Sequence, residues 1–156
     1  MWWRIKRSEF EKEKGDGNKH AMKALVRSGN IPGILAYDGK KPVAWCSVAP
    51  REEYSVLARS RILSPIDTKH VWSVVCFFVE KNYRNRGLSV KLLKAAVEYV
   101  KDNGGKIVEG YPIEPKKKPW PAVFASTGLF TAFKNAGFKE NIRRSETRPI
   151  MRYYIE

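Results

Sequence analysis

VWSVVCFFV, residues 71 to 79, decides the fold, because it is the most apolar run in the chain. It is too short for a typical helix and is rich in Val and Phe, which favour a buried central strand. NYRNRGLSVKLL, residues 82 to 93, follows it and places basic and amide side chains and Gly87 directly before an apolar-periodic run. The two stretches therefore predict a strand, a basic loop and a helix in succession.

The helix after Gly87 is predicted to begin near Leu88 or Ser89 and to end at residues 103–105, Asn-Gly-Gly. KIVEGY, residues 106 to 111, predicts a second buried strand. A strand, a helix and a strand in this order predict a parallel pair joined by a right-handed crossover. The apolar stripe of the helix consists of Leu88, Leu92, Leu93, Ala96, Val97 and Val100.

The first third of the chain predicts a helix and a hairpin. NKHAMKALVRSGN, residues 18 to 30, repeats apolar side chains at helical spacing and then stops at a glycine. Asp38-Gly39 lies between two apolar runs and is a strong hairpin signal, so residues 33–37 and 42–48 are predicted to be antiparallel neighbours. The apolar face of the helix is formed by Ala21, Met22, Leu25 and Val26.

Four further segments complete the order of elements. Residues 52–63 predict a helix that packs through Tyr54, Leu57 and Ala58. Four prolines exclude a regular element from residues 112–121, so this stretch is predicted to be a loop over one end of the sheet. TGLFTAFKNAGF, residues 127 to 138, predicts a short helix that packs through Leu129, Phe130 and Phe133. FKENIRR, residues 138 to 144, and RPIMRYYIE, residues 148 to 156, predict an antiparallel pair of strands.

The resulting order of elements predicts an α/β fold with a mixed sheet, antiparallel at the start and parallel in the middle. The 156 residues, of which 43% are hydrophobic, suffice for one core, so a single domain is expected over residues 1–156. No apolar run approaches the ~20 residues that span a bilayer, and no secretory signal is visible. Cys46 and Cys76 lie in strand-like segments, which indicates reduced, buried cysteines in a cytoplasmic protein without membrane contact.

The net charge of +14 is large for a chain of this size. It is compatible with a nucleic acid, a phosphate-bearing ligand or an acidic partner. The basic residues are spread along the whole chain, however, and only residues 116–118 form a run of three lysines. Most aromatic side chains occupy periodic, buried positions rather than a basic stripe, so a basic nucleic-acid-binding domain is the less favoured alternative.

The loop before the helix has the chemistry of a phosphate site. The first turn of a helix carries unpaired N–H groups and partial positive charge, which suit a pyrophosphate. Gly87 permits close backbone approach, Ser89 is small, and Arg84 and Arg86 add charge-assisted contacts. Neither GxxxxGK[ST] nor a GxGxxG after a strand is present. A basic loop with a glycine hinge is the plainer interpretation of the same residues.

Arg84, Gly87 and Ser89 form the pattern Arg-x-x-Gly-x-Ser, which resembles the signature of the GNAT N-acetyltransferase superfamily, with Ser in place of its final Gly or Ala. Val79 lies five residues before Arg84, as the family's valine does, and residues 137–138 supply its Gly-Phe pair. The resemblance covers about residues 71 to 140. It implies helices on both faces of a sheet that splays between the strands near 73–79 and 107–111.

The resemblance also implies acetyl-CoA as cosubstrate, no metal, and an unknown amine acceptor. Main-chain groups of Phe77 and Val79 would pair with the pantetheine arm, and the N–H groups from residue 84 to residue 89 would hold the pyrophosphate. The neutral amine would attack the thioester directly in a ternary complex. The cofactor-binding residues implied in this way are Phe77, Phe78, Val79, Arg84, Asn85, Arg86, Gly87, Leu88, Ser89, Phe130 and Phe133.

The catalytic groups are less defined, because Phe133 stands where the family often has a tyrosine that protonates the leaving thiolate. Tyr111 and Ser126 are candidates for that role. Glu109, in a buried strand, could take the proton of the amine directly or through water, or could instead pair with an arginine. A catalytically weak acetyl-CoA-binding sensor or partner domain is the alternative that Phe133 motivates.

The acceptor is the least defined part. The family's usual acceptor regions correspond to the segment around residues 45–54 and to the loop of residues 112–124. Glu114, in this loop, could select a cationic amine. The acceptor could be a small amine, an amino acid, an antibiotic or a protein amino group. A homodimer through the C-terminal hairpin is possible.

Overall fold

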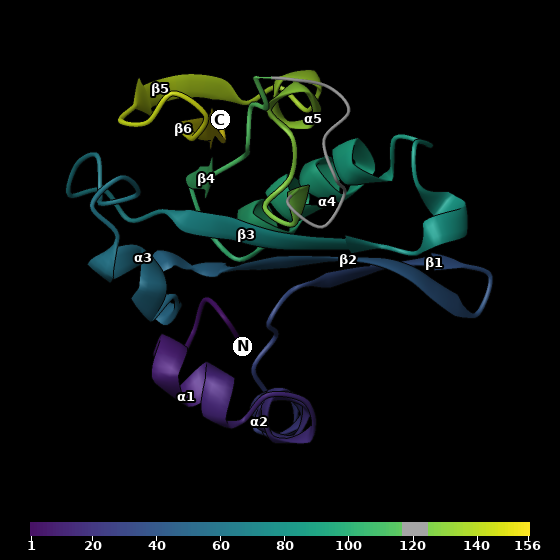
Figure 1. Cartoon of the computed structure of the whole chain (residues 1–156). Coiled ribbons are helices and arrows are strands. Elements are labelled where there is room, and N and C mark those ends of the chain that lie inside the picture. The colour runs from purple at the N-terminus through teal and green to yellow at the C-terminus, as the bar shows by residue number, and fades with distance from the viewer. Residues whose placement is uncertain (117–124) are drawn as a thin grey trace.

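The computed structural model describes residues 1–116 and 125–156 and folds them around one six-stranded sheet (Figure 1). The order of the strands across the sheet is β1-β2-β3-β4-β6-β5. All neighbouring pairs are antiparallel except β3 and β4, which are parallel. The strands are β1 (Ile34–Asp38), β2 (Lys41–Pro50), β3 (Trp72–Val79), β4 (Ile107–Gly110), β5 (Lys139–Arg143) and β6 (Pro149–Tyr154). The predicted mixed sheet is therefore confirmed.

Helices cover both faces of this sheet (Figure 1). α4 (Leu88–Asp102) and α5 (Phe130–Asn135) lie on one face, named here the α4 face. α1 (Arg7–Lys12), α2 (Asp16–Arg27) and α3 (Ser55–Arg59) lie on the other, the α3 face. Each face has its own apolar cluster. No helix of the described residues is long and apolar enough to cross a membrane.

The crossover from β3 through α4 to β4 follows the prediction closely. α4 begins at Leu88, directly after a left-handed Gly87, and ends before Gly104, which has a positive φ. Its stripe buries Leu92, Leu93, Ala96, Val97 and Val100 against the sheet. Because full burial of a large apolar side chain contributes about 1.5 to 3 kcal/mol, this stripe is enough to fix the helix over β2 and β3.

The two predicted hairpins also form. β1 and β2 pair from residue 34 to residue 46 around the turn at Asp38-Gly39, and Gly39 adopts the positive φ that such a turn requires. β5 and β6 pair as predicted at the C-terminus. Of the side chains predicted to pack inward from α5, Phe133 is fully buried and Phe130 is half-buried, but Leu129 is exposed, because it precedes the helix and faces a cavity.

The helix predicted over residues 52–63 is wrong in length. The structure has a single 3₁₀ turn, η1 (Arg51–Glu53), followed by the five-residue α3. After Arg59 the chain leaves the helix, and the Arg51 guanidinium donates to the carbonyl oxygens of Leu57 and Leu63, at 3.5 and 2.6 Å. Tyr54 and Leu57 are buried as predicted, whereas Ala58 is exposed.

The N-terminal helices differ from the prediction in two respects. α1 had no periodic signal and was not predicted. α2 has Met22 and Leu25 half-buried, but Ala21 and Val26 are exposed, and none of its residues is fully buried, because the helix lies on the outer side of the α3 face (Figure 1). Residues 117–124, which include Trp120 and much of the predicted proline-rich loop, lie outside the described residues.

Candidate functional site

A gap opens in the middle of the sheet where β3 and β4 separate. The two strands pair only over Trp72–Val74 and Val108–Gly110. On its other side, β3 has a bulge at Val75, because Ser47 pairs with Cys76 while Val48 pairs with Val74. A bulge bends a strand locally, so this one turns the second half of β3 away from β4. The predicted splay of the sheet is confirmed.

Part of this gap is occupied by the chain itself. The N–H of Phe77 donates to the carbonyl oxygen of Ser126 at 2.7 Å. Ser126 follows the undescribed segment and leads through Gly128 into α5. The segment after β4 is bound to this stretch too, since the N–H of Ile113 donates to the Gly128 carbonyl at 2.9 Å. The short stretch from Ser126 to Gly128 therefore lies between the separated strands.

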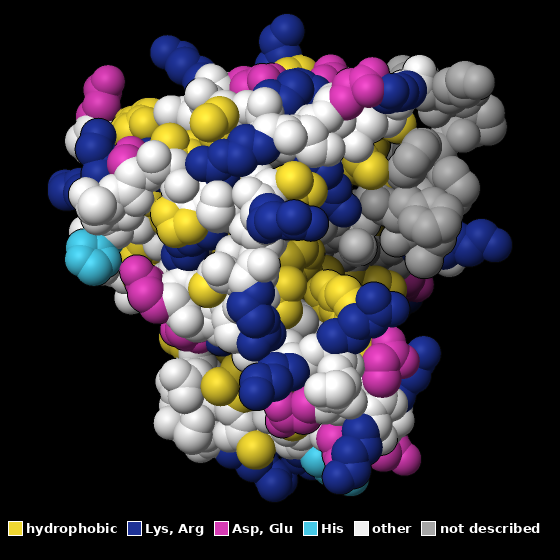
Figure 2. Space-filling view, turned by 60° about the vertical axis from the view of Figure 1, so that its left-hand side comes forward, with side chains coloured by type: hydrophobic (Ala, Val, Ile, Leu, Met, Phe, Trp, Pro, Cys, Tyr) yellow, Lys and Arg dark blue, Asp and Glu magenta, His cyan; other side chains and the backbone are white. Residues whose placement is uncertain are grey.

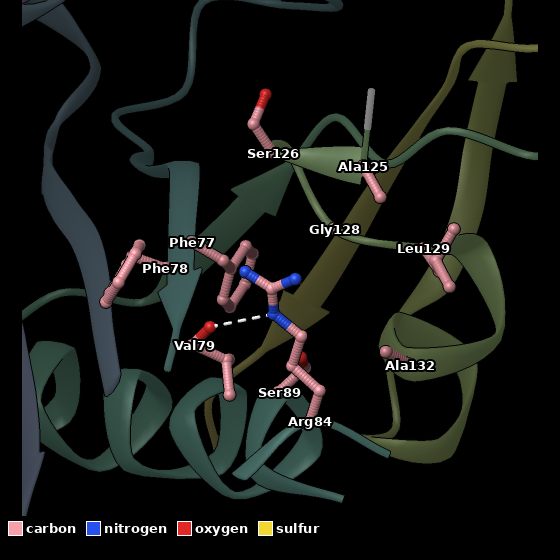
Figure 3. Close-up of a pocket in the computed structure, with 10 residues that line it drawn as sticks. All are labelled: Phe77, Phe78, Val79, Arg84, Ser89, Ala125, Ser126, Gly128, Leu129 and Ala132. Carbon is pink, nitrogen blue, oxygen red and sulfur yellow. Dashed lines mark hydrogen bonds between the residues drawn. The ribbon is translucent and has the colours of Figure 1, made fainter. Parts of the chain in front are cut away.

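A cavity of about 460 Å³ lies at this gap, on the side of β3 that β4 has left (Figure 3). Its walls come from the end of β3, the loop before α4, and the stretch that leads into α5 (Figure 3). A second cavity, of about 450 Å³, surrounds the loop before α4 and shares lining residues with the first, so the two adjoin. The shared residues are Val79, Arg84, Ser89, Leu129 and Ala132.

The loop before α4 presents unpaired main-chain donors to the second cavity. Gly87 has φ +73° and the N-cap position, and Asn85 has φ +59°. The first helical bonds run from the N–H groups of Val90 and Lys91 to the Gly87 carbonyl, so the preceding amides have no acceptor within the helix. A Cβ at Gly87 would meet no atom within 4 Å. The residues present therefore fit a pyrophosphate, with an open approach at Gly87.

Two arginines add positive charge at this loop. The Nε of Arg84 donates to the carbonyl oxygen of Val79 at 3.0 Å, and its guanidinium extends across the first cavity (Figure 3). The guanidinium of Arg86 lies over the ring of Tyr83, 5.5 Å from the ring centroid. Among the described residues, neither guanidinium has a carboxylate within 4.0 Å. An anionic ligand would supply the missing partner for both.

Most of the residues predicted to bind a cofactor lie around these cavities. Phe77, Phe78, Val79, Arg84, Asn85, Gly87, Leu88 and Ser89 line one or both of them. Arg86 lines neither cavity, because its guanidinium lies over the ring of Tyr83. Phe130 and Phe133 do not belong to either lining: Phe133 is fully buried, and Phe130 packs beneath Arg143. Leu129, directly before α5, and Ala132, within α5, line the cavities instead.

Phe133 packs behind the lining of the gap. Its ring packs edge-on against Phe77 and Phe138, with centroids 6.0 and 5.1 Å away. It also lies against two glycines, since a Cβ at Gly110 would be 2.0 Å from the ring and one at Gly128 would be 2.8 Å from it. The absence of side chains at both glycines is therefore required by the position of Phe133.

Glu109 is fully buried and is bound on both sides by arginines. Its two carboxylate oxygens accept from Nη1 of Arg51 at 2.9 Å and from Nε of Arg152 at 2.7 Å. Arg152 in turn binds both carboxylate oxygens of Asp67, at 2.7 and 3.1 Å. The pairing of Glu109 with an arginine, one of the two alternatives derived from the sequence, is the arrangement that the structure shows.

Tyr111 belongs to the same buried network. Its hydroxyl donates to Glu109 at 2.7 Å and lies 2.7 Å from the Ser73 hydroxyl. Burial, followed by the Glu109 charge, raises the pKa of this phenol well above its ordinary value. Of the three residues predicted to be catalytic, only Ser126 lines the cavity at the gap. A catalytic role for Glu109 or Tyr111 stays a prediction. In the structure, both residues bind other side chains of the buried network.

The residues that sequence reasoning missed come from the short stretch before α5 and from that helix. They are Ala125, Gly128, Leu129, Thr131, Ala132 and Asn135. A run of small side chains after the proline-rich stretch was the available signal, because small residues mark places where another backbone or a ligand approaches closely.

Both cysteines are free thiols. Cys46 is buried, Cys76 is half-buried, and burial raises the pKa of both thiols.

The sequence matches the model of the acetyltransferase (GNAT) family over residues 1–111. Because this match covers well over half of the chain, the chain belongs to the GNAT family of acetyltransferases. The match includes β3, the loop and α4, but it ends before α5 and the Gly137-Phe138 pair. A comparison with curated proteins gave no match.

Solved structures share the fold at low identity. The ribosomal-protein-alanine N-acetyltransferase of Brucella melitensis is 14% identical, with 90% of this chain and 78% of that chain covered and a TM-score of 0.55. The PaiA N-acetyltransferase of Thermoplasma acidophilum, in complex with coenzyme A, is 13% identical, with 97% and 80% covered and a TM-score of 0.55. The yncA protein of Salmonella typhimurium, solved with its cofactor acetyl-CoA, is 11% identical, with 90% and 73% covered and a TM-score of 0.55.

Proposed function

We propose that this protein transfers the acetyl group of acetyl-CoA to a primary amine by direct attack in a ternary complex. The observation that supports the proposal most is the adjoining pair of cavities, one lined by the amide-rich loop before α4 and the other by the gap between β3 and β4. The two together provide a place for a pyrophosphate and, next to it, a place for an extended arm that ends in a thioester.

In the proposed complex the main-chain amides at the start of α4 bind the pyrophosphate, with Arg84 and Arg86 as ionic partners. The pantetheine arm runs along the open edge of β3. Residues two apart on a strand turn their main-chain groups the same way, so the Phe77 carbonyl and the Val79 N–H face this edge together. The Phe77 N–H and the Val79 carbonyl are already bonded, to Ser126 and Arg84. The arm therefore pairs with the other two groups or displaces Ser126.

The reaction forms a C–N bond between the amine and the acetyl carbonyl carbon and breaks the C–S bond. The nitrogen loses one proton, and coenzyme A leaves as a thiolate that gains one. Positioning of the two reactants at the gap supplies much of the rate enhancement. Phe133 cannot donate a proton, so we propose that water, or the Ser126 hydroxyl at the cavity wall, protonates the thiolate.

The experiment that tests this function has two parts. Calorimetric titration with acetyl-CoA, with ATP and NAD as phosphate-bearing controls at moderate salt, measures whether the cavities select this cofactor. Release of free thiol in the presence of a panel of amines, with the product identified by mass spectrometry, measures transfer. Micromolar affinity for acetyl-CoA alone together with amine-dependent thiol release is the expected result. Equal weak binding of all three ligands would contradict the proposal.

The second candidate function is an acetyl-CoA-binding protein without fast turnover. The observation in its favour is the fully buried Phe133, which replaces a proton-donating side chain by a hydrocarbon wall. Selective binding of acetyl-CoA with no thiol release above the rate of hydrolysis, for every amine in the panel, would establish it in place of the enzyme.

A further inference from the structure

Arg148 lies at the gap in the sheet but belongs to none of the interactions described so far. It immediately precedes β6. Its Nη1 donates to the Thr127 hydroxyl at 2.9 Å and to the Tyr111 carbonyl oxygen at 3.3 Å. Tyr111 is the residue that follows β4, and Thr127 follows the Ser126 carbonyl that binds β3. The guanidinium of Arg148 therefore touches both chain segments that border the gap.

The alternation of side chains along β6, continued one residue beyond the start of the strand, places Arg148 on the side of the sheet opposite α4. Ile150 packs in the cluster of the α3 face, and Arg152 binds Glu109 in the network beside it. Arg148 is in phase with these two side chains, because side chains two residues apart on a strand point the same way. The loop before α4 approaches the gap from the α4 face. Arg148 and the proposed pyrophosphate site therefore flank the gap from opposite faces.

The charge of Arg148 has no opposite charge beside it. The side chain is half-buried, and burial lowers the pKa of its guanidinium. Within the part of the chain that the structure describes, no carboxylate lies within 4.0 Å of it, and residues 117–124 contain no Asp or Glu. The other arginines near β4 and β6 differ, since Arg51 and Arg152 both bind carboxylates.

A partly buried cation with neutral partners is costly unless a further ligand completes it. Glu114, the nearby carboxylate that could have selected a cationic acceptor, binds Arg143 at 2.7 Å instead. The chain also carries a net charge of +14. Figure 2 shows lysines and arginines bordering a hollow that exposes hydrophobic side chains between the upper and lower parts of the molecule. This field attracts anions rather than cationic amines.

We propose that Arg148 binds a carboxylate of the acceptor, so that the acceptor is a small amine that carries a carboxylate, as an amino acid does. The inference rests on the proposed function and specifies its substrate class. The guanidinium holds the carboxylate through donors other than Nη1, and the amine then points into the gap from the α3 face. A charge-assisted pair of this kind fixes orientation as well as affinity.

The test compares amino acids with their carboxamides, which differ only in the charge of the group that Arg148 would bind. The carboxylate holds the neighbouring amine in its protonated form more strongly, so an enzyme without carboxylate recognition should prefer the carboxamide. We expect the wild-type protein to prefer the amino acids. Arg148→Gln retains N–H donors for Thr127 and Tyr111 but loses the charge, and it should raise KM for the amino acids about 10- to 100-fold. Its KM for carboxamides and its affinity for acetyl-CoA should change less than about twofold.

The matched control is Arg144→Gln. Arg144 lies in the same connection between β5 and β6, and within the described part of the chain its side chain bonds only to the carbonyl oxygens of Ser64 and Pro65, but it is exposed. Arg144→Gln should leave the preference for amino acids unchanged. Arg148→Lys keeps the charge and should retain part of the preference for amino acids. This variant replaces Arg148→Gln in the comparison if Arg148→Gln has a lowered melting temperature. Equal losses with both substrate types, or a wild-type preference for carboxamides, would show that Arg148 only clamps the two segments.

Direct binding separates this inference from the proposed function. Calorimetric titration of an amino acid into the protein saturated with coenzyme A needs no turnover. Binding that Arg148→Gln abolishes, without any acetyl transfer, would support the carboxylate site and contradict the enzyme. If the protein acetylates amines but does not discriminate between amino acids and their carboxamides, the proposed enzymatic function stands and the carboxylate site is overturned.

Discussion

The two ends of the β3–β4 pair differ in whether the charged side chains there have partners of opposite charge. At the paired end, Glu109 is held between Arg51 and Arg152, and the second of these continues to Asp67. At the open end, Arg84 and Arg148 bond only to carbonyl oxygens and a hydroxyl, among the described residues. Arginines lie at both ends, but only at the paired end do carboxylates of the described residues neutralise them.

This difference separates structural charges from ligand-binding charges. A buried ion pair whose members satisfy each other fixes the sheet and has no capacity left for a substrate. A cation with only neutral partners retains that capacity. A charged residue at the centre of a sheet is therefore a weak indicator of catalysis until its partners are known, and the following experiments test the distinction.

The largest effect is expected at the paired end. Glu109→Gln leaves two buried guanidiniums without their shared counter-charge, so the free energy of unfolding should fall by about 3 to 5 kcal/mol in urea denaturation. The control is Glu140→Gln, which removes an exposed carboxylate from Arg143 and should cost about 0 to 1 kcal/mol. A fall in turnover of about 100-fold or more, with the free energy of unfolding hardly changed, would contradict this structural role and indicate a general base.

The next effect is expected at the open end. Gly87→Trp places an indole at the mouth of the loop, where nothing lies within 4 Å of a Cβ, and should weaken acetyl-CoA binding more than about 100-fold, or about 2.7 kcal/mol, by calorimetry. A side chain at φ +73° also costs about 1 to 2 kcal/mol of stability. Gly39→Trp, at φ +59° in the hairpin turn and equally free of neighbours, controls for this strain. Unchanged affinity in Gly87→Trp would show that the loop is not the phosphate site.

A smaller effect is expected from Phe133, the ring that packs behind the lining of the gap. Phe133→Tyr adds a hydroxyl to the ring that packs on Gly110 and Gly128, and a proton donor there should raise kcat about tenfold with little change in acetyl-CoA affinity. Phe138→Tyr adds the same hydroxyl to the neighbouring buried ring, 5.1 Å away, and should not raise kcat. An unchanged or lower kcat in Phe133→Tyr would mean that protonation of the thiolate does not limit turnover.

The smallest effect is a pH dependence at the outer end of the network. Hydrogen bonds from Arg152 lower the pKa of the Asp67 carboxyl from 3.8 to about 2. The stabilisation from this pair is therefore fully present above pH about 4 and is lost as the pH falls toward 2. Urea midpoints of wild type and Asp67→Asn should differ at pH 7 and converge near pH 2. A difference that persists at pH 2 would place the stabilisation elsewhere.

The sequence predicts the strands, loop and helix around the site better than the side-chain contacts within it. The run at residues 71–79, the loop with Gly87 and the stripe of α4 are local patterns, and each forms as predicted. The short length of α3 was not predicted, and the chain around it is held by the Arg51 side chain, which binds the Leu63 carbonyl oxygen and, far away in the sequence, Glu109. The partners of Glu109 and Arg148 are likewise long-range contacts that no spacing pattern indicates.

The hydrogen bond between Phe77 and Ser126 has a consequence for the solubility of the protein. A sheet that separates in its middle exposes a strand edge there as well as at its margins, and an unpaired strand edge can recruit a strand from another chain. The Ser126 carbonyl blocks this edge at Phe77, the point where β3 has left β4. The stretch before α5 thus protects the protein from edge-to-edge aggregation.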